Sequence, residues 1–180
     1  MSLININNSS DPNFRYKINK IDITHTGTGT QKGFFTKLNN IKLVASQINH
    51  NPQTLLKYLG ICLGSKVNEE SFWIQGNHSI DKIQDCIFDY IKTFVLCLKC
   101  SVPELEYTTE KIQKTTIIKT HCIGCGFDNN IESNILNKYN KKIYNKIIND
   151  IQSSYFNKEN YTSNLETTDD FIIQEQEDFF

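Results

Sequence analysis

The clearest hydrophobic pattern of the chain lies between residues 79 and 94. Isoleucine or phenylalanine recurs at three- and four-residue steps, at positions 80, 83, 87, 91 and 94, while charged side chains fill many of the positions between. This spacing places the apolar side chains on one face of an α-helix. Ser79 directly precedes the run and is a preferred N-cap residue. We therefore predict an amphipathic helix that begins after Ser79 and buries one face.

Shorter apolar patterns precede this helix and predict a compact α/β core over residues 21–94. Turn and capping signals divide the stretch into a loop, two short helices and a strand. These signals are the Gly-rich loop 27–33, Asn40 before the first helix, Asn51-Pro52 at the start and Gly60 at the end of the second, and Gly76-Asn77 after the strand 72–75.

The chain changes character after residue 94, where paired cysteines flank β-rich segments at 106–109 and 115–120. A further amphipathic helix is predicted over about 134–149, with Leu136, Tyr139, Ile143 and Ile147 in register. The predicted fold class is α+β. Its expected parts are a flexible N-terminal tail 1–20, an α/β core domain 21–94, a four-cysteine zinc ribbon 95–130, an amphipathic helix 131–150 and an acidic disordered tail 151–180.

Composition and charge indicate which partners the protein could bind and argue against a membrane or secreted protein. The 180 residues are 38% hydrophobic and carry a net charge of -1, which divides into +5 over 1–60, -2 over 61–130 and -4 over 131–180. The basic front could contact RNA phosphates, and the acidic-aromatic tail could bind a basic partner. No apolar run suits a membrane span or a secretory signal, so we expect a cytoplasmic protein. We also expect a monomer.

The strongest chemical signal is a pair of C-x-x-C motifs separated by twenty-one residues. Four soft thiolates at this spacing predict one tetrahedral structural Zn²⁺, with no open position for water. The expected ligands are Cys97, Cys100, Cys122 and Cys125. Disulfides are a competing interpretation, which an intracellular chain without a signal disfavours. A thioredoxin-like redox pair is another, which the presence of two such pairs at ribbon spacing disfavours.

Other residues near the cysteine pairs have simpler interpretations. Gly124 and Gly126 suit the tight backbone of a zinc knuckle, where only glycine adopts positive φ at little cost. His121 could displace a thiolate, but a surface histidine is favoured because four cysteines complete the site. Cys62 and Cys86 lie in apolar helical stretches and are predicted to be core thiols.

Several motifs stand out beside the cysteine pairs. They are Asp11-Pro12-Asn13-Phe14-Arg15-Tyr16-Lys17, Gly33-Phe34-Phe35-Thr36 with Asn40, Lys57-Tyr58-Leu59-Gly60 with Leu63-Gly64, Gly76-Asn77-His78, and Ile91-Lys92-Thr93-Phe94-Val95-Leu96-Cys97. Over about residues 11–130, these motifs and the cysteine pairs resemble the amino-terminal domain of eukaryotic translation initiation factor five. The core of that domain is shared with the beta subunit of translation initiation factor two. The chain departs from the family where the family's Met and Pro are Ile18 and Asn19, and where a common lysine is Phe35.

The resemblance implies a role in start-codon selection on the small ribosomal subunit. It implies stimulation of GTP hydrolysis in the factor-two ternary complex, with Arg15 as the activating arginine supplied in trans. The expected partners are the gamma and beta subunits of factor two, the small subunit and the initiator transfer RNA complex. Candidate partner or RNA contacts are Lys17, Lys32, Lys37 and Lys57.

Two alternatives remain open at this point. The chain could be a beta-subunit-like RNA- and protein-binding component without GTPase-activating activity. It could also be a ribosome-binding module that has lost activation, because 180 residues leave no room for the helical-repeat domain of factor five. The loop Gly27-Thr28-Gly29-Thr30 lacks the Walker spacing, so we expect no nucleotide site and no enzymatic active site in the chain itself.

Overall fold

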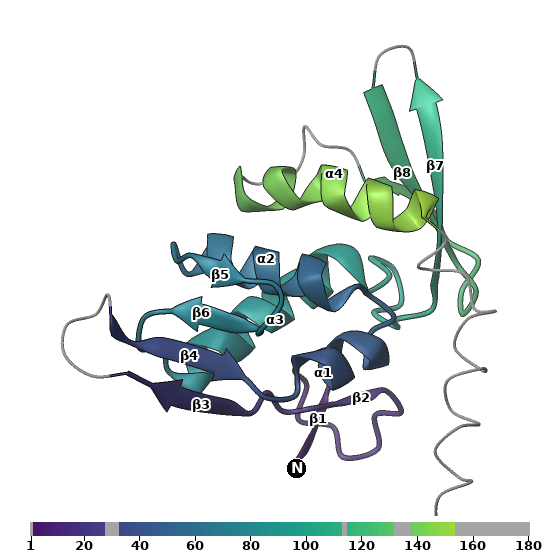
Figure 1. Ribbon diagram of the computed structural model, residues 1–180. Helices are drawn as coiled ribbons and strands as arrows, with labels where there is room; N and C mark the ends of the chain where they lie inside the picture. Colours follow the sequence, from purple (N-terminus) through teal and green to yellow (C-terminus); the bar gives the residue numbers. More distant parts are fainter. Residues whose placement is uncertain (1, 28–32, 113–114, 132–137, 154–180) are drawn as a thin grey trace, which may run out of the picture.

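The computed structural model describes residues 2–27, 33–112, 115–131 and 138–153, which form three small sheets and four helices (Figure 1). The elements in chain order are β1 Leu3–Asn5, β2 Lys17–Asn19, β3 Ile23–Thr26, β4 Phe35–Leu38, α1 Ile41–Gln47, α2 Pro52–Cys62, β5 Val67–Asn68, β6 Trp73–Gln75, α3 Ile80–Phe94, β7 Leu105–Ile112, β8 Thr115–Cys122, β9 Asp128–Ile131 and α4 Lys138–Gln152. The α+β class predicted from the sequence is confirmed.

The core combines helices α1 to α3 with an antiparallel sheet of order β3-β4-β6-β5. Alternate side chains of this sheet, such as Thr36, Leu38 and Ile74, are fully or almost fully buried. Helix α3 contributes the apolar face predicted for it, since Ile83, Ile87, Ile91 and Phe94 are buried, and Ser79 Oγ accepts from the Lys82 N–H. In Figure 1, α3 passes behind strands β4 and β6, so the helices cover one face of the sheet.

Two helix-boundary predictions need correction. Asn40 does precede α1, but its side chain does not cap the helix. It accepts from the Asp22 N–H at 2.8 Å and donates to the Lys20 carbonyl at 2.9 Å, and so holds the segment before β3 instead. Gly60 does not end α2, which continues to Cys62 and is followed by Gly64 at φ +64°. The Asn51 cap is confirmed.

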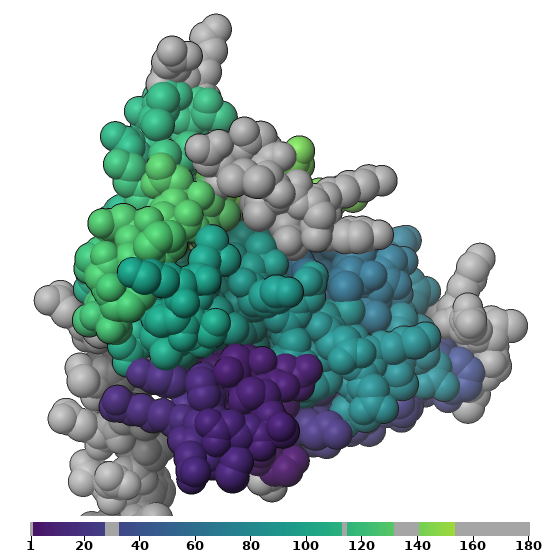
Figure 2. Space-filling view, turned by 180° about the vertical axis from the view of Figure 1, so that it is seen from behind, coloured from purple at the N-terminus to yellow at the C-terminus, as the bar shows by residue number. Residues whose placement is uncertain are grey.

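The N-terminal segment, expected to be a flexible tail, is folded. Strands β1 and β2 pair antiparallel, with Ile4 opposite Ile18, and Ile6 and Ile18 are buried in the core. Figure 2 shows these residues as one purple patch against the teal surface that includes α3. The prediction of a tail was wrong because the polar residues 7–13 form a loop between two short strands whose apolar residues pack into the core.

The three-stranded sheet, of order β7-β8-β9, is called the second sheet below, and the cysteine pairs lie near one of its ends. Its long strands β7 and β8 extend the two segments predicted from the sequence, and Figure 1 shows their hairpin projecting from the body. Helix α4 joins this sheet to the core. The Tyr144 hydroxyl donates to the Ile131 carbonyl and accepts from the Ile118 N–H, while Asp150 accepts from Thr54 of α2 at 2.5 Å.

The predicted helix 134–149 is therefore present over Lys138–Gln152, and positions 134–137 lie outside the described residues. Ile143 and Ile147 are buried as expected. Leu136 and residues 154–180 of the expected acidic tail lie outside the described residues, and the side chain of Tyr139 does as well. No helix among the described residues is long and apolar enough to cross a membrane.

Buried hydrogen bonds connect the core to the second sheet. His50 is fully buried between two tyrosines, with Nδ1 at 2.7 Å from the Tyr90 hydroxyl and Nε2 at 3.3 Å from the Tyr107 hydroxyl. Tyr107 in turn donates to the Phe94 carbonyl at 2.5 Å. Because the Tyr107 proton is directed at Phe94, His50 Nε2 is the donor in the contact with Tyr107.

Cys62 and Cys86, predicted to be core thiols, form a disulfide. Cys62 ends α2 and Cys86 lies in the middle of α3, and their Cα atoms are 6.5 Å apart. The sequence placed both in apolar helical stretches but offered no means of pairing them, because the partner of a helical cysteine depends on how two helices cross.

Candidate metal centre and arginine loop

The four cysteines of the two C-x-x-C motifs converge at one end of the second sheet. Their Sγ atoms all lie within 4.8 Å of one another, with Cys97 and Cys125 at 3.7 Å and Cys100 and Cys122 at 3.6 Å. A tetrahedral zinc ion with Zn–S bonds of about 2.3 Å would place its sulfurs about 3.8 Å apart. The four thiols therefore fit one tetrahedral metal ion, and the predicted ligands are brought together.

Tight turns present the sulfurs. Cys97 lies three residues after the end of α3, and Cys122 is the last residue of β8, so each motif begins at or just after the end of a regular element. The Gly126 N–H donates to the Cys122 carbonyl at 2.7 Å, and Gly126 has φ +67°, as the sequence predicted for a knuckle glycine. Gly124 is needed for another reason, because a Cβ there would lie 2.8 Å from Glu104 Oε2.

The electrostatics of the cluster favour a cation. Burial opposes ionisation of the Cys97 thiol, but N–H groups of Cys100 and Lys99 outweigh it and lower the pKa of Cys97 to about 7. Burial raises the pKa of Cys122 to about 12. Four thiolates cannot ionise together in so small a volume without a compensating charge, and a divalent ion supplies that charge.

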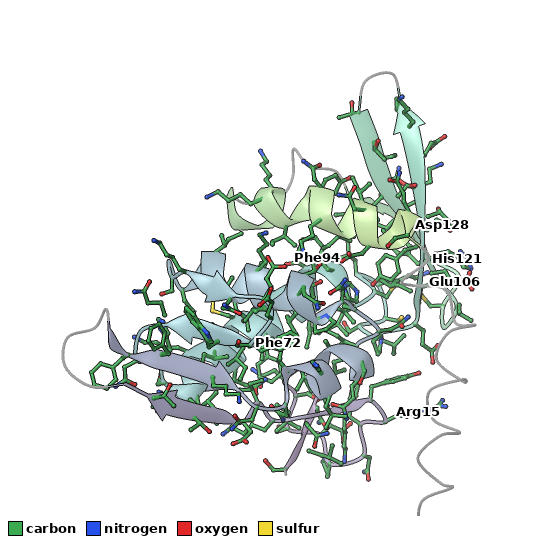
Figure 3. All side chains as sticks on the ribbon, viewed as in Figure 1. Arg15, Phe72, Phe94, Glu106, His121 and Asp128 are labelled. Carbon is green, nitrogen blue, oxygen red and sulfur yellow. A yellow bond between two sulfur atoms is a disulfide. The ribbon has the colours of Figure 1, made fainter. Side chains whose placement is uncertain are left out.

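His121 lies outside this cluster, as the favoured interpretation of the sequence held. Its Nδ1 is 2.7 Å from Asp128 Oδ1, and its side chain is half exposed. Glu106 of β7 is its neighbour on the other side in the strand register, and Figure 3 shows the three side chains along one face of the ribbon. His121 thus belongs to a cross-strand polar row at the surface.

Arg15 lies in the loop that joins β1 to β2, and its side chain is exposed and points away from the body in Figure 3. It is the only arginine of the sequence, in which every other basic side chain apart from the histidines is lysine. Its guanidinium carbon lies 5.6 Å from the centre of the Tyr16 ring. The structure therefore presents a solitary guanidinium on a short loop.

Tyr16 connects this loop to the cysteine cluster. Its hydroxyl donates a hydrogen bond to Glu104 Oε1, and this bond, together with burial, raises the pKa of Tyr16. Glu104 lies directly before β7, and its carbonyl accepts from the Ile123 N–H within the second C-x-x-C motif at 2.9 Å. Phe14 packs edge-on against Tyr16 with ring centres 6.0 Å apart. The arginine loop and the cysteine cluster are thus neighbours.

The candidate lysines occupy separate elements and form no single patch among the described residues. Lys17 lies beside Arg15, and its Nζ donates to the Pro12 carbonyl at 3.2 Å. Lys37 is exposed on β4, and Lys57 of α2 pairs with Glu69 at 3.0 Å. Lys32 lies outside the described residues.

Sequence reasoning missed Tyr16 and Glu104 as parts of the site. Tyr16 was noted only as a member of a motif, and Glu104 was not singled out. Eighty-eight positions separate them, and only the folding of the N-terminal strands onto the core brings them together. No strong local signal could have found this contact, because the apolar positions Ile4, Ile6 and Ile18 are too few to mark buried strands.

Comparisons with known proteins identify a family and several relatives. Residues 6–128 match the family described as the domain found in initiation factors 2B and 5. Eukaryotic translation initiation factor 5 of Caenorhabditis elegans is 33% identical over 132 residues, which cover 69% of this chain and 29% of that protein. The Mus musculus protein of the same name is 33% identical over 129 residues, covering 69% and 29%.

The same factor of Saccharomyces cerevisiae is 30% identical over 130 residues, covering 70% of this chain and 31% of that protein. The chain therefore spans about three-tenths of the length of these relatives. The family match includes Arg15, Tyr16, Glu104 and all four clustered cysteines. The chain belongs to the family of the domain found in initiation factors 2B and 5.

Proposed function

We propose that the protein is a translation initiation factor that acts in start-codon selection and stimulates GTP hydrolysis by the factor-two ternary complex through Arg15. The observation that carries this proposal is the exposed guanidinium of Arg15 on a loop that Tyr16 ties to the base of the ribbon. The matching relatives are named as initiation factors, which supports the same role.

The proposed mechanism needs no nucleotide site in this chain. A guanidinium supplied in trans enters the GTP site of a partner and neutralises the charge that develops on the phosphoryl oxygens. Its planar fork can contact two oxygens at once, which a lysine ammonium cannot do. A braced loop loses less conformational entropy on docking than a free tail would. The protein thus acts as an activator without an active site of its own.

The cysteine cluster is proposed to hold a structural Zn²⁺. Four thiolates close the coordination sphere, so the ion has no position for a reacting water and contributes stability only. Metal binding would join the two C-x-x-C turns and thereby fix Glu104, whose carbonyl and carboxylate contact the second turn and Tyr16 respectively. Zinc would then act on GTP hydrolysis indirectly, by keeping the arginine loop in place.

The proposed partners follow from the same role. They are the gamma and beta subunits of factor two, the small ribosomal subunit and the initiator transfer RNA complex, met by a monomer in the cytoplasm. Lys17, Lys37 and Lys57 are candidate contacts, together with Lys32. Of these, Lys57 already holds Glu69 in an ion pair, so it would have to release or share that carboxylate.

A second candidate is supported by the description of the family, which names initiation factor 2B as well as initiation factor 5. In that role the chain would be a beta-subunit-like component that binds RNA and protein but does not activate hydrolysis. Stable co-purification with the gamma subunit would favour this role. A ribosome-binding module without activation is the variant in which the same surfaces dock but Arg15 contributes nothing.

GTP hydrolysis separates these roles. The wild-type chain is added to preformed ternary complex on small ribosomal subunits, and phosphate release is followed in a single turnover. Arg15→Ala and Arg15→Lys are compared with Lys111→Ala, which removes an exposed charge from the ribbon hairpin. We expect both Arg15 variants to lose about 10³-fold of the stimulated rate, in the range found for trans-acting arginines. No stimulation by the wild type, or full stimulation by Arg15→Ala, overturns the activator role.

A further inference from the structure

The four-stranded sheet has a second face that the helices do not cover. Thr36, Leu38 and Ile74 alternate into the core, so Phe35, Lys37 and Trp73 must point to the opposite side of the sheet. In Figure 1 this side faces away from α3. Phe35 and Trp73 are partly exposed there, and Lys37 is exposed.

The strand register gathers these side chains. Lys37 of β4 lies opposite Trp73 of β6 on one side and Thr24 of β3 on the other. Phe35 lies on the diagonal from Trp73, and the two ring centres are 4.5 Å apart at an interplanar angle of 65°. Two aromatic rings and one ammonium group therefore share the centre of the face.

The rest of the face is polar and uncharged. The outward positions of the described strands are Thr24, Thr26, Phe35, Lys37, Asn68, Trp73 and Gln75. None of these seven positions carries a carboxylate, and Lys37 is the charged residue among them. Asp22 lies at the edge of the face, joined to Thr24 through the Asn39 amide. A ligand that suits it offers flat apolar groups, negative charge and hydrogen-bonding edges.

Single-stranded RNA has this chemistry. Its unstacked bases lie on aromatic side chains, and its phosphates pair with lysine or arginine. A cross-strand aromatic pair can also serve only to stabilise a sheet. That simpler explanation does not account for the exposed lysine beside the two rings or for the absence of acids at these seven positions.

We propose that this face of the sheet binds single-stranded RNA, with bases stacked on Trp73 and Phe35 and a phosphate paired with Lys37. Binding of this kind is tolerant of sequence, because every base offers a ring face. It does not depend on GTPase activation by Arg15, which lies on a different part of the molecule, in the β1–β2 loop.

The test uses the fact that Trp73 is the only tryptophan of the chain. Its fluorescence is recorded while a 12-nucleotide oligouridylate is added, and binding of the same RNA, labelled, is measured in parallel by anisotropy. We expect RNA binding to quench Trp73 with the same midpoint as the anisotropy change. RNA binding without quenching would place the RNA elsewhere and overturn the proposal, and so would no binding at all.

Variants locate the contacts. We expect Phe35→Leu and Trp73→Leu each to weaken RNA binding at least about fivefold, the lower end of the range for base–aromatic stacking. Lys37→Gln should lower the slope of log K against log salt by about 0.7. Phe88→Leu, which removes a half-buried ring on α3, and Lys111→Gln are the matched controls and should bind as the wild type does.

Two further outcomes would contradict the proposal. Trp73 fluorescence that changes with protein concentration in the absence of RNA would show that the face contacts a second copy of the chain. Equal RNA affinity in Phe35→Leu and the wild type, with both folded by circular dichroism, would show that the aromatic pair is structural. If Trp73→Leu does not fold, the wild-type quenching experiment and Phe35→Leu decide the question.

Discussion

Tyr16 and Glu104 join the two features on which the proposed function depends. The Tyr16 hydroxyl donates to Glu104 Oε1, with Tyr16 next to the exposed Arg15 and Glu104 hydrogen-bonded through its carbonyl to the second cysteine motif. The arginine loop is therefore joined through Glu104 to the cysteine cluster. If the cluster holds a metal ion as proposed, loss of that ion should disturb the position of Arg15.

The first prediction concerns this hydrogen bond. Tyr16→Phe keeps the ring against Phe14 but removes the donor, so the fold should persist while the Arg15 loop loses its brace. A positioning cost of about 1 kcal/mol corresponds to about fivefold in rate. We expect a decrease of about that size in stimulated GTP hydrolysis, measured in a single turnover.

A double-mutant cycle gives the control for Tyr16→Phe. Glu104→Ala should reduce hydrolysis to a similar extent, and the double variant should be no slower than either single variant, because both remove the same contact. Additive losses would show that Tyr16 and Glu104 act separately and would contradict the brace.

The second prediction concerns removal of the metal. Chelation should open the two C-x-x-C turns and release Glu104, so amide exchange should accelerate at Ile123 and Gly126 and in the loop around Arg15. Helices α1 to α3 should keep their protection, because their core does not include the cysteine cluster. Unchanged exchange around Arg15 in the chelated protein would disprove the coupling.

The third prediction is a pH dependence of stability that arises from His50. Burial lowers the pKa of His50 to about 3, whereas an unfolded histidine titrates near 6.5. Between these values the unfolded chain binds a proton that the folded chain does not, so stability falls as the pH drops below about 6.5. At pH 5 the loss should be about 2 kcal/mol in the free energy of unfolding.

Urea denaturation of the wild type and His50→Gln at pH 7.5 and 5 measures this effect. Asp150, whose pKa is raised by burial, acts in the opposite direction, and comparison of the two proteins removes its contribution. The variant should lose less stability on acidification than the wild type. Equal losses in the two proteins would mean that His50 is not held neutral.

The fourth prediction concerns the disulfide between Cys62 and Cys86. Closing a loop across a separation of 24 residues should stabilise the folded chain by about 3 kcal/mol. Cys86→Ser should therefore melt at a lower temperature than the wild type under oxidising conditions. With a phosphine reductant the two proteins should have the same melting temperature. If the reductant leaves the melting temperature of the wild type unchanged, the disulfide is contradicted.

Local patterns predicted the parts of the fold that local forces determine. The period of α3, its Ser79 cap and the Asn51-Pro52 start of α2 follow from side-chain spacing and capping chemistry alone. The cysteine cluster was predicted as well, because two C-x-x-C turns and a hairpin leave few other arrangements. In each case the interaction spans a few residues or depends on one strong chemical preference.

The errors came from long-range contacts. The N-terminal strands are three residues each, too short for an alternation that stands out, and they become stable only because Ile6 and Ile18 enter the core. The pairing of Cys62 with Cys86 depends on the crossing of α2 and α3. The side chain of Asn40 was expected to cap a helix, but it bonds to the backbone of Lys20 and Asp22. These groups come near Asn40 only in the folded chain, so the sequence could not indicate the contact.

The central claim is that Cys97, Cys100, Cys122 and Cys125 hold one zinc ion, which keeps the ribbon and the Arg15 loop in place. Elemental analysis of the purified full chain tests it most directly, alongside titration of accessible thiols in the folded state. The account predicts one zinc ion per chain and four cluster thiols that react only after chelation. A folded protein without zinc, in which these four thiols react freely, would contradict it.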